Sequence, residues 1–337
     1  MRIRTLQRIV LCTAAAGVLT AAPANGIGGP VSGFVFDGRS HALRPINGFP
    51  GSATIGAPLT LPFSAGLAVF ATSLDYAIIT DAHGTGEPFL VRGLASGAAT
   101  VTPLANGIVS SMVVLAASGS AAALYSQPNA RLQFISGLPA QPQAGSPVDV
   151  SSLNAGVSSL AVDPAGRSAL LITGDGSIYW TGVNGQGPQF VLRAAGASSV
   201  SILPNGQDAV VGNRDTGEVL LIRGFAGAAS VSTLTGAGAG ITSAAAVQAL
   251  SNHDAAIVDG TGRLAIADLD TSAVTWMGLA GKADRIEQDG NLLLLNHPGN
   301  GPLLLLDLTN GRTTYFVPSD QPTNFEAHKG TDLWKHY

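Results

Sequence analysis

The fold is decided by one stretch of sequence, Val157-Ser-Ser-Leu-Ala-Val-Asp-Pro-Ala-Gly-Arg-Ser-Ala-Leu-Leu-Ile-Thr173, which continues as Gly174-Asp-Gly-Ser-Ile-Tyr-Trp-Thr181 and Gln189-Phe-Val-Leu-Arg193. Its Val, Ile, Leu and aromatic residues fall into four short runs, which are typical of β-strands. Each run is bounded by Gly, Asp, Asn or Pro, which adopt turn conformations easily. In the turn Asp163-Pro-Ala-Gly166, Pro fixes φ and Gly accepts the positive φ that closes the turn. The stretch therefore predicts four antiparallel strands.

The same pattern of apolar run, polar turn and apolar run returns six times between Leu74 and Gly290. Aligned on the first turn, the equivalent positions are Leu74, Gly119, Gly166, Gly206, His253 and Gly290. Their spacings are 45, 47, 40, 47 and 37 residues, a mean of about 43, which is the period of a four-stranded propeller blade. The sequence therefore predicts an all-β chain folded as a β-propeller.

Extending this period past both ends of the array predicts one further blade, built from the two ends of the chain. Before the array, Gly33-Phe-Val-Phe-Asp37 has the pattern of a second strand, and Ala42–Ile46 and Ser52–Gly56 supply a third and a fourth. After the array, Phe325–Trp334 stands where a first, inner strand is expected. We expect these four strands to share a blade, which would close a seven-bladed ring and remove exposed sheet edges.

The first 24 residues have the pattern of a cleaved secretory signal peptide. Its basic start, an apolar segment too short to span a bilayer and a small-residue cleavage site are Arg2, Arg4 and Arg8, then Ile9–Leu19, then Ala22-Pro-Ala24. We therefore expect a mature protein of one propeller domain, residues 25–337, in the periplasm or outside the cell. The one cysteine, Cys12, lies in the leader, so no disulfide is expected.

Charge and hydropathy exclude several classes of partner. Charged residues make up 11% of the chain and the formal net charge is −4, so neither a nucleic-acid face nor a polybasic membrane patch is expected. The apolar runs of Asn291–Leu306 are interrupted by six turn-forming residues, and they predict a buried hairpin rather than a membrane span. We expect a monomer without a cofactor.

Three turns carry a family likeness: Asp163-Pro-Ala-Gly-Arg167, Leu203-Pro-Asn-Gly-Gln207 and Gln288-Asp-Gly-Asn291. They resemble the first-hairpin turns of the bacterial WD40-like, YVTN-type and NHL-type propellers. The resemblance implies a secreted propeller but says almost nothing about activity. The chain lacks the Trp-Asp dipeptide and the Gly-His opening of true WD40 repeats, so the structural hydrogen-bond network of that family is not carried over.

Candidate ligand-binding residues lie in the loops between second and third strands, which open on one face around the channel mouth of a propeller. They are His83, Asp175, Arg214, Asp215, Asp259 and His297. Asp175 and Asp259 precede Gly, so tight turns account for them equally well. No turn geometry requires His83, Arg214 or His297. Side chains of such mixed polarity could bind a protein, a peptide or a glycan.

No catalytic or metal-ligating motif is recognisable in the sequence. The histidines are scattered, and the expected inner strands are dominated by small and apolar residues. Glu287 is the exception, and it either faces the channel or pairs with Arg285 or Lys282. The sequence therefore predicts a non-catalytic binding or scaffolding module. The alternative is a lactonase-like or other hydrolytic propeller enzyme, which would gather metal ligands in its channel.

Overall fold

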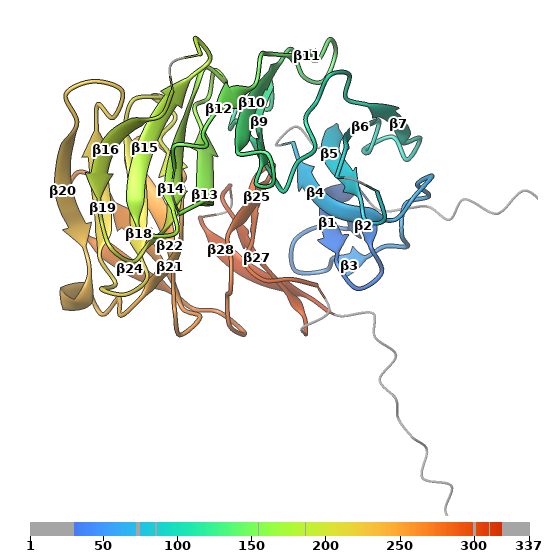
Figure 1. The fold of residues 1–337 in the computed structure, drawn as a ribbon. Coiled ribbons are helices and arrows are strands. Elements are labelled where there is room, and N and C mark those ends of the chain that lie inside the picture. Colours follow the sequence, from blue (N-terminus) through green and yellow to red (C-terminus); the bar gives the residue numbers. More distant parts are fainter. Residues whose placement is uncertain are drawn as a thin grey trace, which may run out of the picture.

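A computed structural model describes residues 30–71, 75–84, 86–153, 155–185, 187–298, 301–309 and 311–318. These residues form seven antiparallel sheets arranged as the blades of a ring, with one 3-10 turn at Ala237–Ala239 (Figure 1). The chain is therefore an all-β, seven-bladed β-propeller, as the sequence predicts. No helix in the described ranges is long and apolar enough to cross a membrane.

The blades follow one another along the chain. Blade 1 contains β1 (Val31–Asp37), β2 (Ala42–Asn47) and β3 (Thr54–Ile55); blade 2 contains β4 (Ala65–Phe70), β5 (Tyr76–Asp81), β6 (Pro88–Arg92) and β7 (Thr100–Pro103). Blade 3 contains β8 (Met112–Leu115), β9 (Ala121–Ser126), β10 (Arg131–Ser136), β11 (Gln143–Ala144) and β12 (Val148–Asp149). Blade 4 contains β13 (Val157–Val162), β14 (Ser168–Thr173), β15 (Ser177–Gly182) and β16 (Gln189–Arg193).

The remaining three blades have four strands each. Blade 5 contains β17 (Ala197–Ile202), β18 (Ala209–Asn213), β19 (Val219–Arg223) and β20 (Ser230–Thr235); blade 6 contains β21 (Ala244–Ala249), β22 (Asp254–Asp259), β23 (Leu264–Asp268) and β24 (Val274–Met277). Blade 7 contains β25 (Glu287–Asp289), β26 (Leu292–Leu294), β27 (Leu303–Asp307) and β28 (Thr313–Val317).

Blade 4 confirms the four strands predicted from its sequence. In the turn between β13 and β14, the Asp163 carboxylate accepts a hydrogen bond from the Arg167 amide at 2.6 Å, and Gly166 adopts a φ of 68°. Blade 3 differs from the predicted pattern because its outer strand is divided into β11 and β12. Pro147, which has no N–H to donate, lies between the two segments and explains the break.

Most of the core lies between neighbouring blades. Val35 and Ile46 of blade 1 pack against Leu292, Leu294 and Leu305 of blade 7, all of them buried. Burying a Leu or Ile side chain of this kind contributes about 1.5–3 kcal/mol. Two consequences follow: the described residues close the ring between its last and first blades, and the Leu-rich run of blade 7 is a buried hairpin, as predicted.

The inner strands of adjacent blades run in the same direction. The Val247 amide donates to the Ser199 hydroxyl and the Ala249 amide donates to the Ser201 hydroxyl, each at 3.0 Å. Both bonds join residues 48 apart, as a parallel arrangement of β17 and β21 requires. Because the blades share this orientation, their second-to-third-strand loops open on the same face.

In blade 1, β1 is the second strand, as predicted. The Gly48 amide donates to the Pro30 carbonyl after β2, as the Gly93 amide donates to the Asp75 carbonyl after the third strand of blade 2. The inner strand that the sequence assigns to Phe325–Trp334 lies outside the described residues. So does the expected signal peptide, residues 1–24.

Candidate functional site

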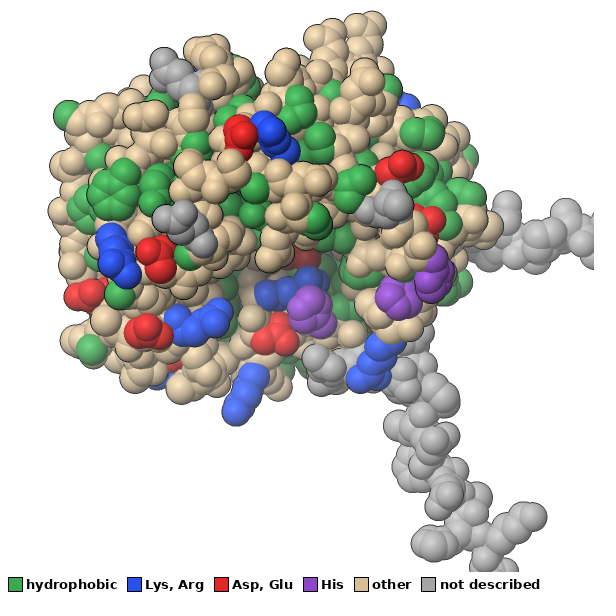
Figure 2. Space-filling view, viewed as in Figure 1, with side chains coloured by type: hydrophobic (Ala, Val, Ile, Leu, Met, Phe, Trp, Pro, Cys, Tyr) green, Lys and Arg blue, Asp and Glu red, His purple; other side chains and the backbone are tan. Residues whose placement is uncertain are grey.

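The central channel contains a cavity of about 540 Å³. Figure 2 shows a hollow near the middle of the molecule, with basic, acidic and histidine side chains beside it. The inner strands of blades 2–7 line the cavity, together with Phe36 of β1. Its wall is mainly apolar, with Leu67, Val114 and Leu160 as examples. A largely apolar cavity with a few fixed polar groups is the usual form of a ligand site.

The charged part of this wall comes from blade 7. Arg285 and Glu287 form an ion pair, with Nη1 and Oε2 2.8 Å apart and with side chains 20% and 22% exposed. This pair is one of the partners that the sequence allows for Glu287. Burial raises the pKa of the Glu287 carboxyl, while the charge of Arg285 acts in the opposite direction. The pair is thus a fixed charged group in a mainly apolar wall that also carries Ser201, Gln248 and Gln288.

Asp289, two residues further along β25, connects blade 7 to blade 1. Its Oδ2 accepts a hydrogen bond from the Phe34 amide of β1 at 2.5 Å, and the residue is fully buried. Burial raises the pKa of Asp289 to about 8; the Phe34 amide opposes this shift and the charge of Glu287 adds to it. Much of the Asp289 population is therefore protonated at neutral pH.

Several buried polar atoms beside the cavity have no hydrogen-bond partner. They are Asp289 Oδ1 and the Nε and Nη2 atoms of Arg285; outside this cluster, the described residues contain one more, Trp180 Nε1. A buried polar atom without a partner costs on the order of 1–3 kcal/mol. Three of the four unpartnered atoms therefore lie close together in sequence, on Arg285 and Asp289 of blade 7.

The six sequence-predicted residues lie in the second-to-third-strand loops of five blades. His83 follows β5, Asp175 follows β14, Arg214 and Asp215 follow β18, Asp259 ends β22 and His297 follows β26. The structure thus distributes them around one face of the ring instead of gathering them in one cluster. His297 is the member that interacts with the charged cavity wall. Partial burial and the charge of Arg285 lower the pKa of His297, and Asp284 opposes this shift.

Two of the six are engaged in their own turns. The Asp175 carboxylate accepts hydrogen bonds from the Thr173 hydroxyl at 2.6 Å and from the Ser177 amide at 3.2 Å. Asp259 is 1% exposed and accepts from both Nε and Nη2 of Arg263, at 3.2 and 2.6 Å. These bonds explain both carboxylates as turn-forming groups, which is the alternative that the sequence leaves open.

The other loop residues are exposed to solvent. The His83 amide donates to Asp81 at 2.9 Å and the Asp215 amide donates to Asn213 at 3.0 Å, so the loop backbones are fixed. Arg214, between Asn213 and Asp215, is exposed as well. His83, Arg214 and Asp215 are therefore available to a ligand that approaches the channel mouth.

The sequence does not indicate the role of Asp289 beside the cavity, because Gln288-Asp-Gly-Asn291 has the pattern of a turn. The signal was the alternation of Arg285, Glu287 and Asp289, since alternate residues of an extended segment share one face. In the described part of the chain, no group of three or more His, Cys, Asp or Glu residues could hold a metal ion.

No family model matches the chain, and no curated protein is similar to it in sequence. In structure, it is similar to part of PorZ, a bacterial surface component of the type-IX secretion system of Porphyromonas gingivalis, with a TM-score of 0.57 and 15% identity. The match covers 87% of this chain and 38% of the PorZ chain. A chain of a nidogen/laminin complex matches with a TM-score of 0.49 and 11% identity, over 68% of this chain and 90% of that chain.

The class that the fold defines is the seven-bladed β-propeller with a central channel, and the likeness to PorZ supports this fold alone. No family match confirms the resemblance to WD40-like, YVTN-type or NHL-type propellers.

Proposed function

We propose that this protein is an exported, non-catalytic β-propeller of the WD40-like, YVTN-type or NHL-type group that binds a protein, peptide or glycan at its channel mouth. The observation that carries the proposal is the cavity of about 540 Å³, in which one ion pair is fixed in an apolar wall. Apolar surface supplies affinity, and a few fixed polar groups supply orientation. The proposed export depends on the signal-peptide pattern of residues 1–24.

The rim of the mouth supports the same proposal. His83, Arg214 and Asp215 are exposed on loops with fixed backbones, and burial and the charge of Arg285 lower the pKa of His297. A ligand that enters the cavity from this face passes these side chains. We assign the cavity to an apolar group of the ligand and the rim to its polar groups.

The experiment is a binding screen of the purified protein against arrays of peptides and glycans, followed by calorimetry of each hit. The variant His83→Ala/Arg214→Ala/His297→Ala is expected to weaken binding at least about tenfold, or about 1.4 kcal/mol. The matched control, Arg223→Ala/His253→Ala, alters residues on the opposite face and is expected to bind normally. Equal affinities of the two variants for the hit would contradict the proposed surface.

One observation favours a second candidate, a hydrolytic propeller. Glu287 and Asp289 are neighbouring buried carboxyls with raised pKa values, and such groups can serve as general acids or bases near neutral pH. The test is a screen of ester and lactone substrates, together with elemental analysis after dialysis. Turnover that disappears in Glu287→Gln, or stoichiometric calcium or zinc, would replace the binding proposal with an enzymatic one.

A further inference from the structure

Several asparagines of this chain directly precede a glycine. Four such pairs lie entirely within the described residues: Asn47-Gly48, Asn106-Gly107, Asn184-Gly185 and Asn205-Gly206. In a pair of this kind, the main-chain nitrogen of Gly can attack the side-chain amide of Asn, because glycine has no Cβ to obstruct the approach. The attack requires an Asn side chain that can rotate and a Gly N–H that no acceptor holds, so the hydrogen bonds of each pair decide its reactivity.

In three of the four pairs, the Gly amide is held by a main-chain hydrogen bond. The Gly48 amide donates to the Pro30 carbonyl at 2.8 Å, the Gly107 amide to the Leu104 carbonyl at 2.9 Å, and the Gly206 amide to the Leu203 carbonyl at 2.9 Å. Each bond must break before the nitrogen can attack, which raises the barrier to the reaction. These three pairs are therefore protected by the turns in which they lie.

The side chain of Asn205 is held as well. Its Oδ1 accepts hydrogen bonds from the Gln207 and Asp208 amides at 2.9 and 3.0 Å, and its Nδ2 donates to Asp208 Oδ2 at 2.9 Å. The side chain cannot rotate toward Gly206 without losing these bonds. Asn205 is nevertheless exposed to solvent. Hydrogen bonding, and not burial, therefore protects this pair.

Asn184 has none of this protection. It lies in the connection between β15 and β16, and both Asn184 and Gly185 are exposed (Figure 1). Neither the Asn184 side chain nor the Gly185 amide forms a hydrogen bond with another residue of the described ranges. A Cβ at Gly185 would meet nothing within 4 Å, so the space around this residue is open. The Asn184 side chain can therefore rotate toward an amide that no acceptor holds.

We propose that Asn184 is a site of spontaneous deamidation. The Gly185 nitrogen gives its proton to a base in solution and attacks Cγ of Asn184. The new N–Cγ bond forms, the Cγ–Nδ2 bond breaks, and Nδ2 takes up a proton and leaves as ammonia. Water then adds to either carbonyl carbon of the cyclic imide and opens it to aspartate or isoaspartate. Each product carries a negative charge where Asn184 was neutral.

The modified residue lies away from the channel mouth. The Val183 amide donates to the Arg167 carbonyl at 2.9 Å, beside the first turn of blade 4, on the face opposite the second-to-third-strand loops. Isoaspartate also inserts an additional carbon atom into the main chain between β15 and β16. Deamidation of Asn184 therefore changes the charge and the turn at the outer edge of blade 4 and leaves the cavity wall unaltered.

Asn184 and Asn205 form a matched pair for the test, because both are followed by Gly-Gln. The full chain is incubated at mildly alkaline pH, and peptide mapping by mass spectrometry follows the loss of each asparagine. In the folded protein, Asn184 is expected to react at least about tenfold faster than Asn205, which must first break several hydrogen bonds. In urea the two rates are expected to converge. Equal rates in the folded protein overturn the proposal, and so does a difference that persists in urea, since local sequence would then be its cause.

A substitution in the same turn tests the attacking atom. Gly185→Ala places a Cβ beside the nitrogen and is expected to slow the loss of Asn184 without changing the loss of Asn205. Gly187→Ala is the matched control, because a Cβ there also meets nothing within 4 Å but is not attached to the attacking residue. It is expected to leave the rate at Asn184 unchanged. If Gly185→Ala reacts as fast as the unaltered chain, the Gly185 nitrogen is not the nucleophile and the proposal is wrong.

Discussion

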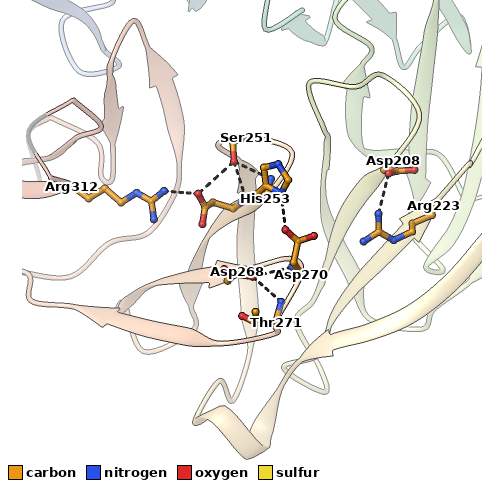
Figure 3. A network of polar contacts seen from close by, with 9 residues as sticks. Asp208, Arg223, Ser251, His253, Asp268, Asp270, Thr271 and Arg312 are labelled. Atoms are coloured by element: carbon orange, nitrogen blue, oxygen red, sulfur yellow. Dashed lines mark hydrogen bonds and ion pairs between the residues drawn. The ribbon is translucent and has the colours of Figure 1, made fainter.

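Two clusters of charged residues lie on opposite sides of the same part of the ring and differ in burial. At the start of blade 7, Arg285 and Glu287 are about one-fifth exposed, Asp289 is fully buried, and three polar atoms are unpartnered. On the opposite face, the turns of blades 5–7 carry the polar network shown in Figure 3. There, His253 pairs with Asp270 at 2.6 Å, with side chains 71% and 56% exposed.

The comparison shows that charged residues of the same types contribute differently to stability according to how far they are buried. In the network of Figure 3, Arg312 Nη2 also contacts Asp254 at 2.6 Å and links blades 6 and 7. Arg312 and Asp254 are 37% and 24% exposed, so this pair is intermediate in burial. Water can solvate the more exposed His253 and Asp270 if their pair is broken, so that pair contributes about 0–1 kcal/mol. At the channel, Arg285 and Glu287 are only 20% and 22% exposed, so removing one partner leaves a charge that is poorly solvated.

The largest expected effect is therefore that of Arg285→Ala. Glu287 would lose its cation in apolar surroundings, and the free energy of unfolding is expected to fall by about 3 kcal/mol. Urea denaturation measures the loss. The control is Arg223→Ala, which removes a 3.5 Å pair with Asp208; the arginine is 51% and the aspartate 13% exposed. Asp208 keeps hydrogen bonds from the Gly224 amide and the Asn205 side-chain amide, each at 2.9 Å, so the variant is expected to cost less than about 1 kcal/mol.

The double variant Arg285→Met/Glu287→Leu tests whether the unpaired charge is the cause. Apolar side chains of similar size need no counter-ion, so the double variant is expected to be more stable than Arg285→Ala. If both variants lose the same stability, packing rather than charge explains the effect of Arg285.

The contact between blades 7 and 1 is tested by Gly33→Ala. A Cβ at Gly33 would lie 2.7 Å from Asp289 Oδ2, so the carboxylate that accepts the Phe34 amide must move. We expect a loss of about 1–3 kcal/mol in urea denaturation. Gly187→Ala is the control, because a Cβ there meets nothing within 4 Å. In an Asp289→Ala background, Gly33→Ala should cost much less; an unchanged cost would place the clash elsewhere.

Much of the architecture was predictable because the strands are short, their turns carry Gly, Pro and Asp, and the period is regular. Blade 4 shows this best, since its four predicted strands are all present. The divided outer strand of blade 3 was not predicted. Its outer segments contain two residues each, too few for a strand pattern to be recognised.

The candidate site was less predictable. His83, Arg214 and His297 could be assigned to loops from strand order alone. The role of Asp289 depends on its distance from Phe34, a residue 255 positions earlier in the chain. No local pattern encodes such a contact, because it arises only when the ring closes and brings the last blade against the first.

The pH dependence of stability separates the buried acid from an exposed one. In the unfolded chain, Asp289 titrates near its ordinary pKa of 3.8, and in the folded protein burial raises its pKa to about 8. Between these values the folded state binds more protons, so stability falls as pH rises, by at most about 1.4 kcal/mol per pH unit, and levels off above about pH 8. Asp289→Asn is expected to lack this slope in urea denaturation.

Asp37 is the matched control because its shift has the opposite sign. Burial alone would raise the pKa of Asp37, but hydrogen bonds from the Ser40 hydroxyl and the Arg39 and Ser40 amides lower it. Its stabilising contribution is therefore present above its unfolded pKa and is lost as pH falls through the lowered folded value. Asp37→Asn should leave the slope between about pH 4 and 8 unchanged. If Asp37→Asn and Asp289→Asn change the slope of stability against pH equally, Asp289 is not the origin of that slope.

The smallest effect is expected for His253→Ala in the exposed network. The imidazole loses its bond to Asp270, but both side chains are more than half exposed, so water replaces the partner. We expect a change within about 0.5 kcal/mol in urea denaturation, and a smaller one at high salt, where exposed charges are screened. If His253→Ala lowers the free energy of unfolding as much as Arg285→Ala does, an exposed pair contributes as much as a buried one. Burial would then not explain the difference between the two clusters.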